Sequence, residues 1–452
     1  MAEATVSKKK KIRRSDYQYT VFKAMRNGDW ITRLSFLIMG FGNIVRKQFV
    51  KGLSFLVLES IFIYFMIKNG ASLLTDFFHL GGAEQEKVWN DAKGIFEYTQ
   101  GDNSLLMLLY GVATVFIIFA FVCLWVVSVE SAYRAQCLHD AGKKVPGFTD
   151  DIKSLFDKNL HMFLLPLPVL GIVVFTILPL VFMICMAFTN YSKLDSHTVL
   201  FNWVGLKNFA KILNFNDAVG STFWSVLGWT LVWAVAATFT NYIFGMILAM
   251  VINRKGTRCK SVWRSIFMLS AAVPQFVSLL LMRTIFSQNG IVNTLLLNHH
   301  IIDNAIPFWS NATIARIMVI VINIWIGIPF NMMLLITGLT TIPAEVYESC
   351  SLDGANKIQT LFMITIPMIK PAIMSVLTLG FVYTFKVFDL VWVMTKGGPI
   401  NSTELVSTYA YRLSFEEFQF SKGAAAANIL FLILLVVGVF YIKLINEEEE
   451  IM

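Results

Sequence analysis

Apolar residues gather in eight long runs that are separated by shorter polar and charged segments. Each run holds about 20 mostly apolar residues, the length that an α-helix needs to cross the hydrocarbon core of a bilayer. The first run is the weakest because it is short and carries Glu59, and an inferior alternative lets residues 31–41 span as well. The pattern predicts an all-α, polytopic membrane protein with about eight transmembrane helices. The runs lie near residues 49–67, 104–128, 162–188, 224–252, 262–286, 314–338, 371–395 and 424–445.

Composition agrees with a chain that is mostly surrounded by lipid. Hydrophobic residues make up 56% of the 452 residues and charged residues only 15%, whereas soluble domains carry about 25% charged residues. The net charge of +8 would suit a nucleic-acid-binding protein. The positive residues, however, cluster in an arm at Lys8–Lys11 and Arg13–Arg14 and in short loops, as orientation signals of membrane proteins do. We therefore expect no nucleic-acid partner.

The N-terminal arm has no apolar stretch with a small-residue cleavage site, so no secretory signal is predicted. Residues 1 to about 16 are expected to form a tail. The segment Trp30–Ile38 is expected to form an amphipathic helix at the membrane surface.

Loop charges predict the orientation of the spans, because Lys and Arg accumulate on the cytoplasmic side. The loops near 129–161 and 253–264 are basic, the loop near 287–313 has no Lys or Arg, and segment 69–103 is mainly acidic. Eight spans with both termini in the cytoplasm fit this alternation. Segment 69–103 has room for a small helical cap but none for a substrate-binding domain.

These boundaries divide the chain into four parts. Residues 1–48 form the basic arm and interfacial helix, and residues 49–160 form two transmembrane helices with a short external loop. Residues 161–446 form a six-helix core with a cytoplasmic loop at 343–370, and residues 447–452 form an acidic cytoplasmic tail.

The cysteines indicate a reducing environment and no metal centre. Cys123 and Cys185 fall in apolar runs, whereas Cys137, Cys259 and Cys350 fall in loops assigned to the cytoplasm. Scattered thiols without paired spacing predict neither disulfides nor a metal site.

Catalytic motifs are missing from the sequence. No Gly-x-x-x-x-Gly-Lys-Ser/Thr loop is present, so this chain is not expected to bind ATP in that way. No nucleophile–base or paired-carboxylate arrangement stands in a soluble segment, and His299-His300 falls in an external loop. We therefore expect no enzymatic activity and no cofactor.

The connection between the sixth and seventh runs predicts a helix, a break and a second helix. A short helix opens after Pro343 with acidic residues near its start, and Asp353-Gly354 ends it. A mostly apolar helix follows and runs to Pro367. By itself this pattern also suits an ordinary interfacial loop.

Residues at several offsets in this connection resemble the Glu-Ala-Ala coupling loop of ABC-importer permeases. Glu348-Ser349-Cys350 occupies the Glu-Ala-Ala positions, and Gly354, Ile364 and Ile366-Pro367 follow at the spacing of that loop. The resemblance implies that the short helix fits a cleft of an ATP-binding subunit and transmits its closure to the spans. It assigns this coupling to Glu348, Ser349, Cys350, Asp353, Gly354, Ala355 and Pro367.

A second pattern narrows the family. Thr395-Lys396-Gly397-Gly398-Pro399 predicts a tight external turn, and Gly423 with the alanines 424–427 allows close packing of the eighth span. Ser402-Thr403, Tyr409, Tyr411 and Phe415 lie between them. The order of these motifs over residues 160–445 is similar to that in carbohydrate permeases, above all those of the MalF-type maltose/maltodextrin group.

That resemblance implies a type I ABC-importer permease fold in a bacterial plasma membrane, and it implies partners. They are a second, MalG-like permease, two copies of an ATP-binding subunit that hydrolyses ATP, an extracellular sugar-binding protein and an oligosaccharide substrate. Another sugar or a glycerol-phosphate-like solute remains an alternative substrate.

Polar and aromatic residues in the spans suggest where a sugar would bind. Pro329 and Gly327 open the sixth span, Asn323 can bond a sugar hydroxyl, and Trp325 or Phe330 can stack on a sugar face. The resemblance adds Ala271 and Gln275 in the fifth span and Gly380 and Thr384 in the seventh. Asn323 could instead bond between helices.

Charged residues in the spans leave a different class of transporter open. Lys386 and Asp389 are expected to form a neutralising pair on one helix. In an ion-coupled secondary transporter this pair and Glu59 would relay the ion. Such transporters often contain inverted repeats, and none is evident in this sequence.

Overall fold

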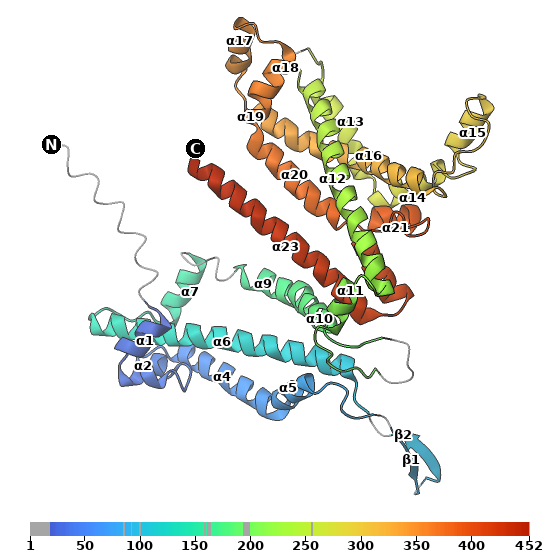
Figure 1. The fold of residues 1–452 in the computed structure, drawn as a ribbon. Helices are drawn as coiled ribbons and strands as arrows, with labels where there is room; N and C mark the ends of the chain where they lie inside the picture. The colour runs from blue at the N-terminus through green and yellow to red at the C-terminus, as the bar shows by residue number, and fades with distance from the viewer. Residues whose placement is uncertain are drawn as a thin grey trace, which may run out of the picture. The chain divides into compact units, whose positions relative to one another are not determined.

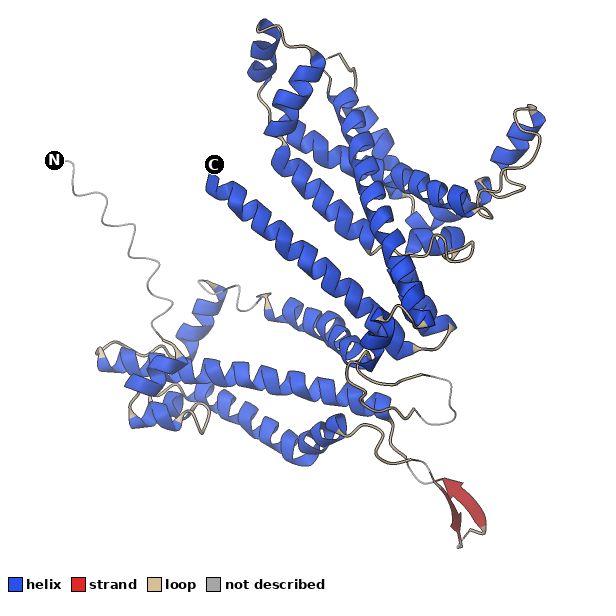
Figure 2. Cartoon of the chain, in the orientation of Figure 1, coloured by secondary structure: helices blue, strands red, loops and turns tan. Residues whose placement is uncertain are grey.

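A computed structural model of the chain describes residues 19–84, 86–91, 93–98, 101–157, 160, 164–192, 199–254 and 256–451 (Figure 1). Two compact units are present, one comprising Met1–Cys185 and Asp195–Trp203, the other Met186–Leu194 and Val204–Met452. Regular structure in both is almost entirely helical (Figure 2), which confirms the all-α prediction. The predicted basic arm at residues 8–14 lies outside the described residues.

The first unit pairs long apolar helices with short helices near its N-terminus. Its elements are α1 (Val21–Asn27), α2 (Trp30–Leu34), α3 (Phe41–Val45), α4 (Phe49–Phe65), the π-helix η1 (Met66–Gly70), α5 (Ala71–Phe78), β1 (Lys87–Asn90), β2 (Ile95–Tyr98), α6 (Ser104–Asp140), α7 (Phe148–Phe156), α9 (Pro166–Ile172), the π-helix η2 (Val173–Ile177) and α10 (Leu178–Met186).

A buried ion pair fastens the short helices of this unit to α6. Arg46 Nη2 lies 2.7 Å from a carboxylate oxygen of Asp29, and Arg46 Nη1 donates to the backbone carbonyl of Ala132 on α6. Burial alone would raise the pKa of Asp29, but hydrogen bonds from Thr32 and Arg46 hold it below its ordinary value. Glu59 on α4 accepts a bond from the Met39 amide at 2.8 Å, so this carboxylate has a structural partner.

This unit differs from the expectations in two details. The helix predicted over Trp30–Ile38 ends at Leu34, because the chain turns there before α3 begins. The segment 69–103, which had room for a helical cap, holds the whole of α5 and in addition a hairpin that was not expected, in which Trp89 pairs with Phe96. β-Branched and aromatic residues in this short segment favour strand over helix.

The second unit contains the remaining helices. They are α11 (Lys207–Leu213), α12 (Ala218–Asn253), α13 (Lys260–Ala272), α14 (Gln275–Ile285), α15 (Ile291–Asn298), α16 (Ala312–Thr340), α17 (Ala344–Leu352), α18 (Lys357–Gln359), the π-helix η3 (Thr360–Thr365), α19 (Ile366–Met368), α20 (Lys370–Phe385), α21 (Asp389–Thr395), α22 (Val406–Tyr411), the π-helix η4 (Arg412–Glu416) and α23 (Phe420–Ile451).

Six helices in the described part of the chain are long and apolar enough to cross a membrane, and two bent helix pairs raise the number to eight. This agrees with about eight predicted spans. The fifth, however, is broken, because α13 and α14 meet at 86°, and residues 357–368 of the predicted coupling loop meet α20 at 75° just before the seventh. Pro274 and Pro371 lie at these breaks, where proline has no amide hydrogen to continue a helix.

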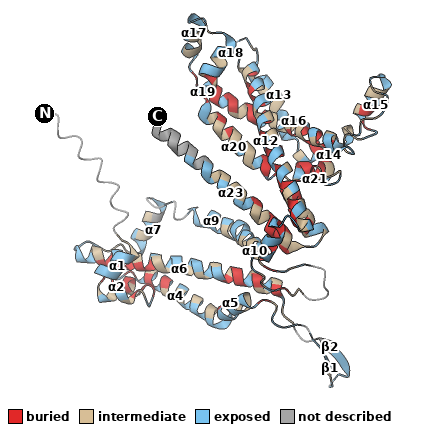
Figure 3. Cartoon of the chain, viewed as in Figure 1, coloured by how far each residue is buried: buried red, intermediate tan, exposed pale blue. Residues whose placement is uncertain are grey.

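Packing of α12, α16 and α20 forms the main core of this unit. Buried positions in Figure 3 follow α12 and α16, and one apolar cluster joins Ile252, Leu335 and Val376 from the three helices. The small residue Gly245 lets α12 approach α16 closely. A Cβ on Gly245 would lie only 2.8 Å from Asn331 Cβ of α16.

The connection between α21 and α22 is built around a buried carboxylate. Arg412 donates from Nε and Nη2 to the two oxygens of Glu404 at 2.8 and 3.0 Å, and Arg412 also contacts Glu417. Burial raises the pKa of Glu404 although Arg412 acts in the opposite direction. The preceding turn is closed by the Thr395 and Thr403 hydroxyls, 2.7 Å apart.

Glu404→Ala should destabilise the second unit by about 2 kcal/mol, because Arg412 would lose both bonds to Glu404 and keep only its contact with Glu417. Thermal unfolding of the purified protein in detergent measures the effect. Glu97→Ala is the control, because Glu97 forms an exposed pair with Lys93 and its loss should leave the midpoint nearly unchanged. Equal midpoints for the two variants would contradict the structural role of Glu404.

Candidate functional site

The predicted coupling segment forms an exposed helix, α17. Pro343 precedes it, Glu345 lies in its first turn, and none of its nine residues is buried. Asp353 caps its end, and Gly354 follows with φ of 77°, a backbone conformation that favours glycine. The side chains of Glu348 and Ser349 are exposed, while Cys350 is half-buried.

The rest of the segment places the remaining predicted residues beside α17. Asn356 begins α18 by exchanging hydrogen bonds with Gln359. Ala355 is half-buried before this cap, and Pro367 is exposed in α19. Most of the predicted coupling residues are therefore accessible to another protein.

The inner face of α17 is attached to the core. Val346 and Tyr347 pack against the cluster that contains Ile252 of α12 and Leu339 of α16. The Tyr347 hydroxyl also lies 3.4 Å from the Thr365 hydroxyl of η3. These contacts connect α17 to the ends of α12 and α16.

Two predicted sugar-site residues flank the break in the fifth span. Ala271 belongs to the last turn of α13, and Gln275 begins α14. Gln275 Oε1 accepts a hydrogen bond at 3.3 Å from the hydroxyl of Tyr383 on α20, a side chain that is 49% exposed. Tyr383 was not among the predicted residues, although it lies three positions after Gly380 and so shares its helix face.

Thr384 and Gly380 lie against α12. Thr384 is 1% exposed, and its hydroxyl lies 2.9 Å from that of Thr238 on α12. A Cβ on Gly380 would approach Thr238 Cγ2 at 3.4 Å. Thr384 therefore serves helix packing here, because its hydroxyl is directed away from any exposed surface.

Asn323 and Gly327 face α12 from α16. Asn323 is 4% exposed, and its Nδ2 has no hydrogen-bond partner among the described residues. A Cβ on Gly327 would lie 2.5 Å from Asn241 Nδ2 of α12, and Asn241 Oδ1 also lacks a partner in the described structure. Asn241 was missed by the sequence analysis, although an amide within the apolar run 224–252 was a signal for it.

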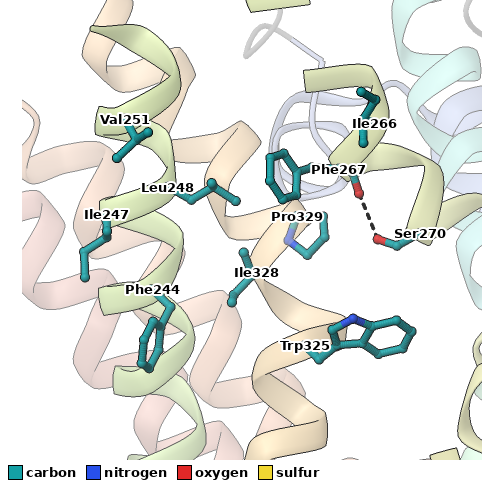
Figure 4. A pocket seen from close by; sticks show the side chains of 10 residues that line it. All are labelled: Phe244, Ile247, Leu248, Val251, Ile266, Phe267, Ser270, Trp325, Ile328 and Pro329. Carbon is teal, nitrogen blue, oxygen red and sulfur yellow. Dashed lines mark hydrogen bonds between the residues drawn. The ribbon is translucent and has the colours of Figure 1, made fainter. Parts of the chain in front are cut away.

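Trp325 points into an apolar pocket of about 420 Å³ between α12, α13 and α16 (Figure 4). The hydroxyl of Ser270, at its edge, already bonds to the Phe267 carbonyl at 2.8 Å. Phe330 is exposed. The eight predicted residues therefore fall into separate groups, at the break of the fifth span, on the α12 interface, in this pocket and on an exposed surface.

The expected pairing of Lys386 with Asp389 on one helix is wrong. Helix α20 ends at Phe385 and α21 starts at Asp389, so the two residues flank a turn. Both side chains are exposed, and no ion pair joins them in the described structure.

A family model described as "Binding-protein-dependent transport system inner membrane component" matches residues 241–447. The match covers α17 and most of the second unit. Thus both the coupling segment and the broken spans lie within it.

Curated relatives are similar over nearly the whole chain. The galactooligosaccharides transport system permease protein GanP of Bacillus subtilis is 28% identical over 87% of this chain and 92% of its own. The maltodextrin transport system permease protein MdxF of the same organism is 28% identical over 92% of this chain and 96% of its own.

A solved bacterial ABC transporter involved in the import of the acidic polysaccharide alginate has a similar fold. One of its chains is 22% identical, with a TM-score of 0.55, and the match covers 65% of this chain and 98% of that one. At this identity the likeness concerns the fold alone.

Gly327→Val should separate α12 from α16, because the added side chain would enter the volume of the Asn241 carboxamide. Overpacking of this kind costs about 1–3 kcal/mol. The yield of folded protein and its melting temperature measure the effect. Gly228→Val on α12 is the control, because a Cβ there meets no atom within 4 Å; the same loss in both variants would refute close packing at Gly327.

Proposed function

The chain belongs to the family of binding-protein-dependent transport system inner membrane components, and from this premise we propose that it carries maltodextrin-type oligosaccharides across the membrane in an ATP-driven importer. It is a sugar-importer permease with several membrane-crossing helices. Its maltodextrin substrate, its use of ATP and its partner subunits are what we propose beyond this.

The exposed coupling helix α17 is the observation that carries the proposal. It presents Glu348 and Ser349 outward, while Val346 and Tyr347 tie it to the cores of α12 and α16. An ATP-binding subunit that grips this helix would therefore move the long helices when it closes. This chain has no phosphate-binding loop, so hydrolysis falls to that partner.

The orientation follows from the loop charges. The basic loops 129–161 and 253–264 and the coupling segment belong on the cytoplasmic side, with both termini. The connection around Glu404 then lies outside. There it would face a separate sugar-binding protein, which the description of the family includes.

One permease chain would form half of the translocation pathway, and the remaining partners would complete it. A second permease of the same kind would form the other half, and two ATP-binding subunits would engage one coupling helix each. Apolar side chains along α12 and α23, such as Val232 and Val436, are exposed and available for lipid or subunit contacts.

Maltodextrin is favoured as substrate by the relatives of that class. The galactooligosaccharide relative marks the nearest alternative sugar. We place the sugar at the break of the fifth span, where Ala271 leaves space and Gln275 and Tyr383 offer an amide and a hydroxyl. Phe330 supplies an aromatic face, and Asn323 and Gly327 set the spacing of α16 from α12.

Uptake by right-side-out membrane vesicles that are loaded with ATP tests the function. Labelled maltodextrin should enter only when ATP, the binding protein and the partner subunits are present. A proton uncoupler should leave uptake unchanged while ATP is held constant. Uptake that stops with the uncoupler would instead identify an ion-coupled transporter.

Gly354→Pro should leave the protein inserted but abolish ATP-driven uptake. Proline holds φ near −65°, whereas Gly354 has φ of 77° and donates its amide to Ser351. Gly142→Pro is a matched control, because Gly142 has φ of 66° and likewise donates its amide to a helix end, at His139. Normal uptake by the Gly354 variant would remove α17 from the coupling mechanism.

Gln275→Leu should weaken sugar-stimulated ATP hydrolysis of the assembled complex about tenfold, the effect of losing one well-placed hydrogen bond. Asn323→Leu should also weaken it without loss of assembly. Gln288→Leu, in an exposed loop outside this region, is the control. Unchanged stimulation in both variants across maltodextrin lengths would place the sugar site elsewhere.

A further inference from the structure

We propose that the crevice between α12, α13 and α16 binds an anionic phospholipid, with one acyl chain in the apolar pocket and the phosphate on Arg254, Lys260 and Arg264. This site shares no lining residue with the proposed sugar position, and the proposal requires only that α12 and the α13–α14 pair cross a bilayer.

The pocket has the chemistry of an acyl-chain site. Its lining is apolar except for Ser270, whose hydroxyl is already bonded to Phe267 (Figure 4). A sugar would have to leave its hydroxyl groups unpaired there, whereas a hydrocarbon chain loses no hydrogen bond. The lining residues are Phe244, Ile247, Leu248, Val251, Ile266, Phe267, Ser270, Trp325, Ile328 and Pro329.

The pocket is open to an entering chain. Val251 on α12 is 58% exposed and Ile266 on α13 is 52% exposed, although both line it. The two side chains form the rim nearest the basic end of the crevice.

Basic side chains continue directly from this rim. Arg254 lies three residues after Val251, and Arg264 lies three residues before Phe267, so each is about one helical turn from its apolar neighbour. Lys260 Nζ donates to the Asn253 carbonyl at 2.7 Å, and Arg264 Nη2 lies 3.5 Å from Asn253 Oδ1. These bonds hold the two cations together at the end of α12.

The basic cluster has no acidic residue in its own part of the sequence. Residues 218–302 contain no Asp or Glu, and none of the three cations forms an ion pair in the described structure. Arg264 Nε is buried without a hydrogen-bond partner among the described residues. A phosphate oxygen would supply that partner, and guanidinium groups match phosphate geometry well.

The dimensions match one leaflet. From Phe244 to Arg254 the helix rises about 15 Å, which is half the thickness of a bilayer's hydrocarbon core. A lipid whose phosphate lies at Arg254 therefore reaches the inner end of the pocket with its acyl chain. A protein partner would match the charges but would have no reason to fill the pocket.

The test compares ligands on the purified importer complex in detergent. Dioleoylphosphatidylglycerol should raise the melting temperature and be retained in native mass spectra, whereas dioleoylphosphatidylcholine and inorganic phosphate should do neither. Equal effects of the two lipids would overturn the anionic headgroup site. The same stabilisation by phosphate alone would overturn the acyl-chain half.

Two pairs of variants locate the site. Lys260→Gln with Arg264→Gln should weaken phosphatidylglycerol binding about tenfold to thirtyfold, while Lys143→Gln with Lys153→Gln, in another basic loop, should not. Ile266→Trp should fill the pocket and reduce binding, while Leu269→Trp, on α13 outside the lining, should not. If the Lys260 and Arg264 changes impair only assembly with the ATP-binding subunit, the cluster is a protein-docking surface and the proposal fails.

Discussion

Backbone hydrogen bonding in a medium without water is the constraint on which this architecture depends. A continuous helix satisfies its own amides and carbonyls, and six helices in the described part of the chain are long and apolar enough to cross a bilayer. A helix break leaves backbone amides and carbonyls without hydrogen-bond partners. It is tolerated only where the break lies beside protein or a polar cavity. The break at Pro274 lies beside the Gln275–Tyr383 bond, and the break at Ile369 adjoins the core below the coupling helix.

Long apolar runs predicted most of the helices, because burial in lipid selects for length and apolarity. They did not predict the breaks, since a bent pair has the same composition as a straight span. The hairpin near Trp89 was missed for a related reason: two short strands leave no long periodic pattern. Lys386 and Asp389 were assigned to one helix because their spacing suits a helix, yet the helix ends at Phe385.

The coupling segment was easier to predict than the sugar site. Pro343 and Gly354 mark local helix ends, and local signals survive in any tertiary context. A binding surface depends instead on which way each side chain points across helices far apart in the sequence. Asn323 proved to be buried and Thr384 to be buried against α12, whereas Tyr383, the exposed neighbour of Thr384, bonds to Gln275. To tell the exposed residues from the buried ones, one must know how α20 and α16 are rotated against α12.

The near independence of α17 from the fold has an evolutionary consequence. All nine of its residues lack full burial, and mainly Val346 and Tyr347 connect it to the core. Substitutions on its outer face should therefore cost little stability. If an ATP-binding subunit docks there as proposed, the docking face can evolve separately from the membrane-embedded core.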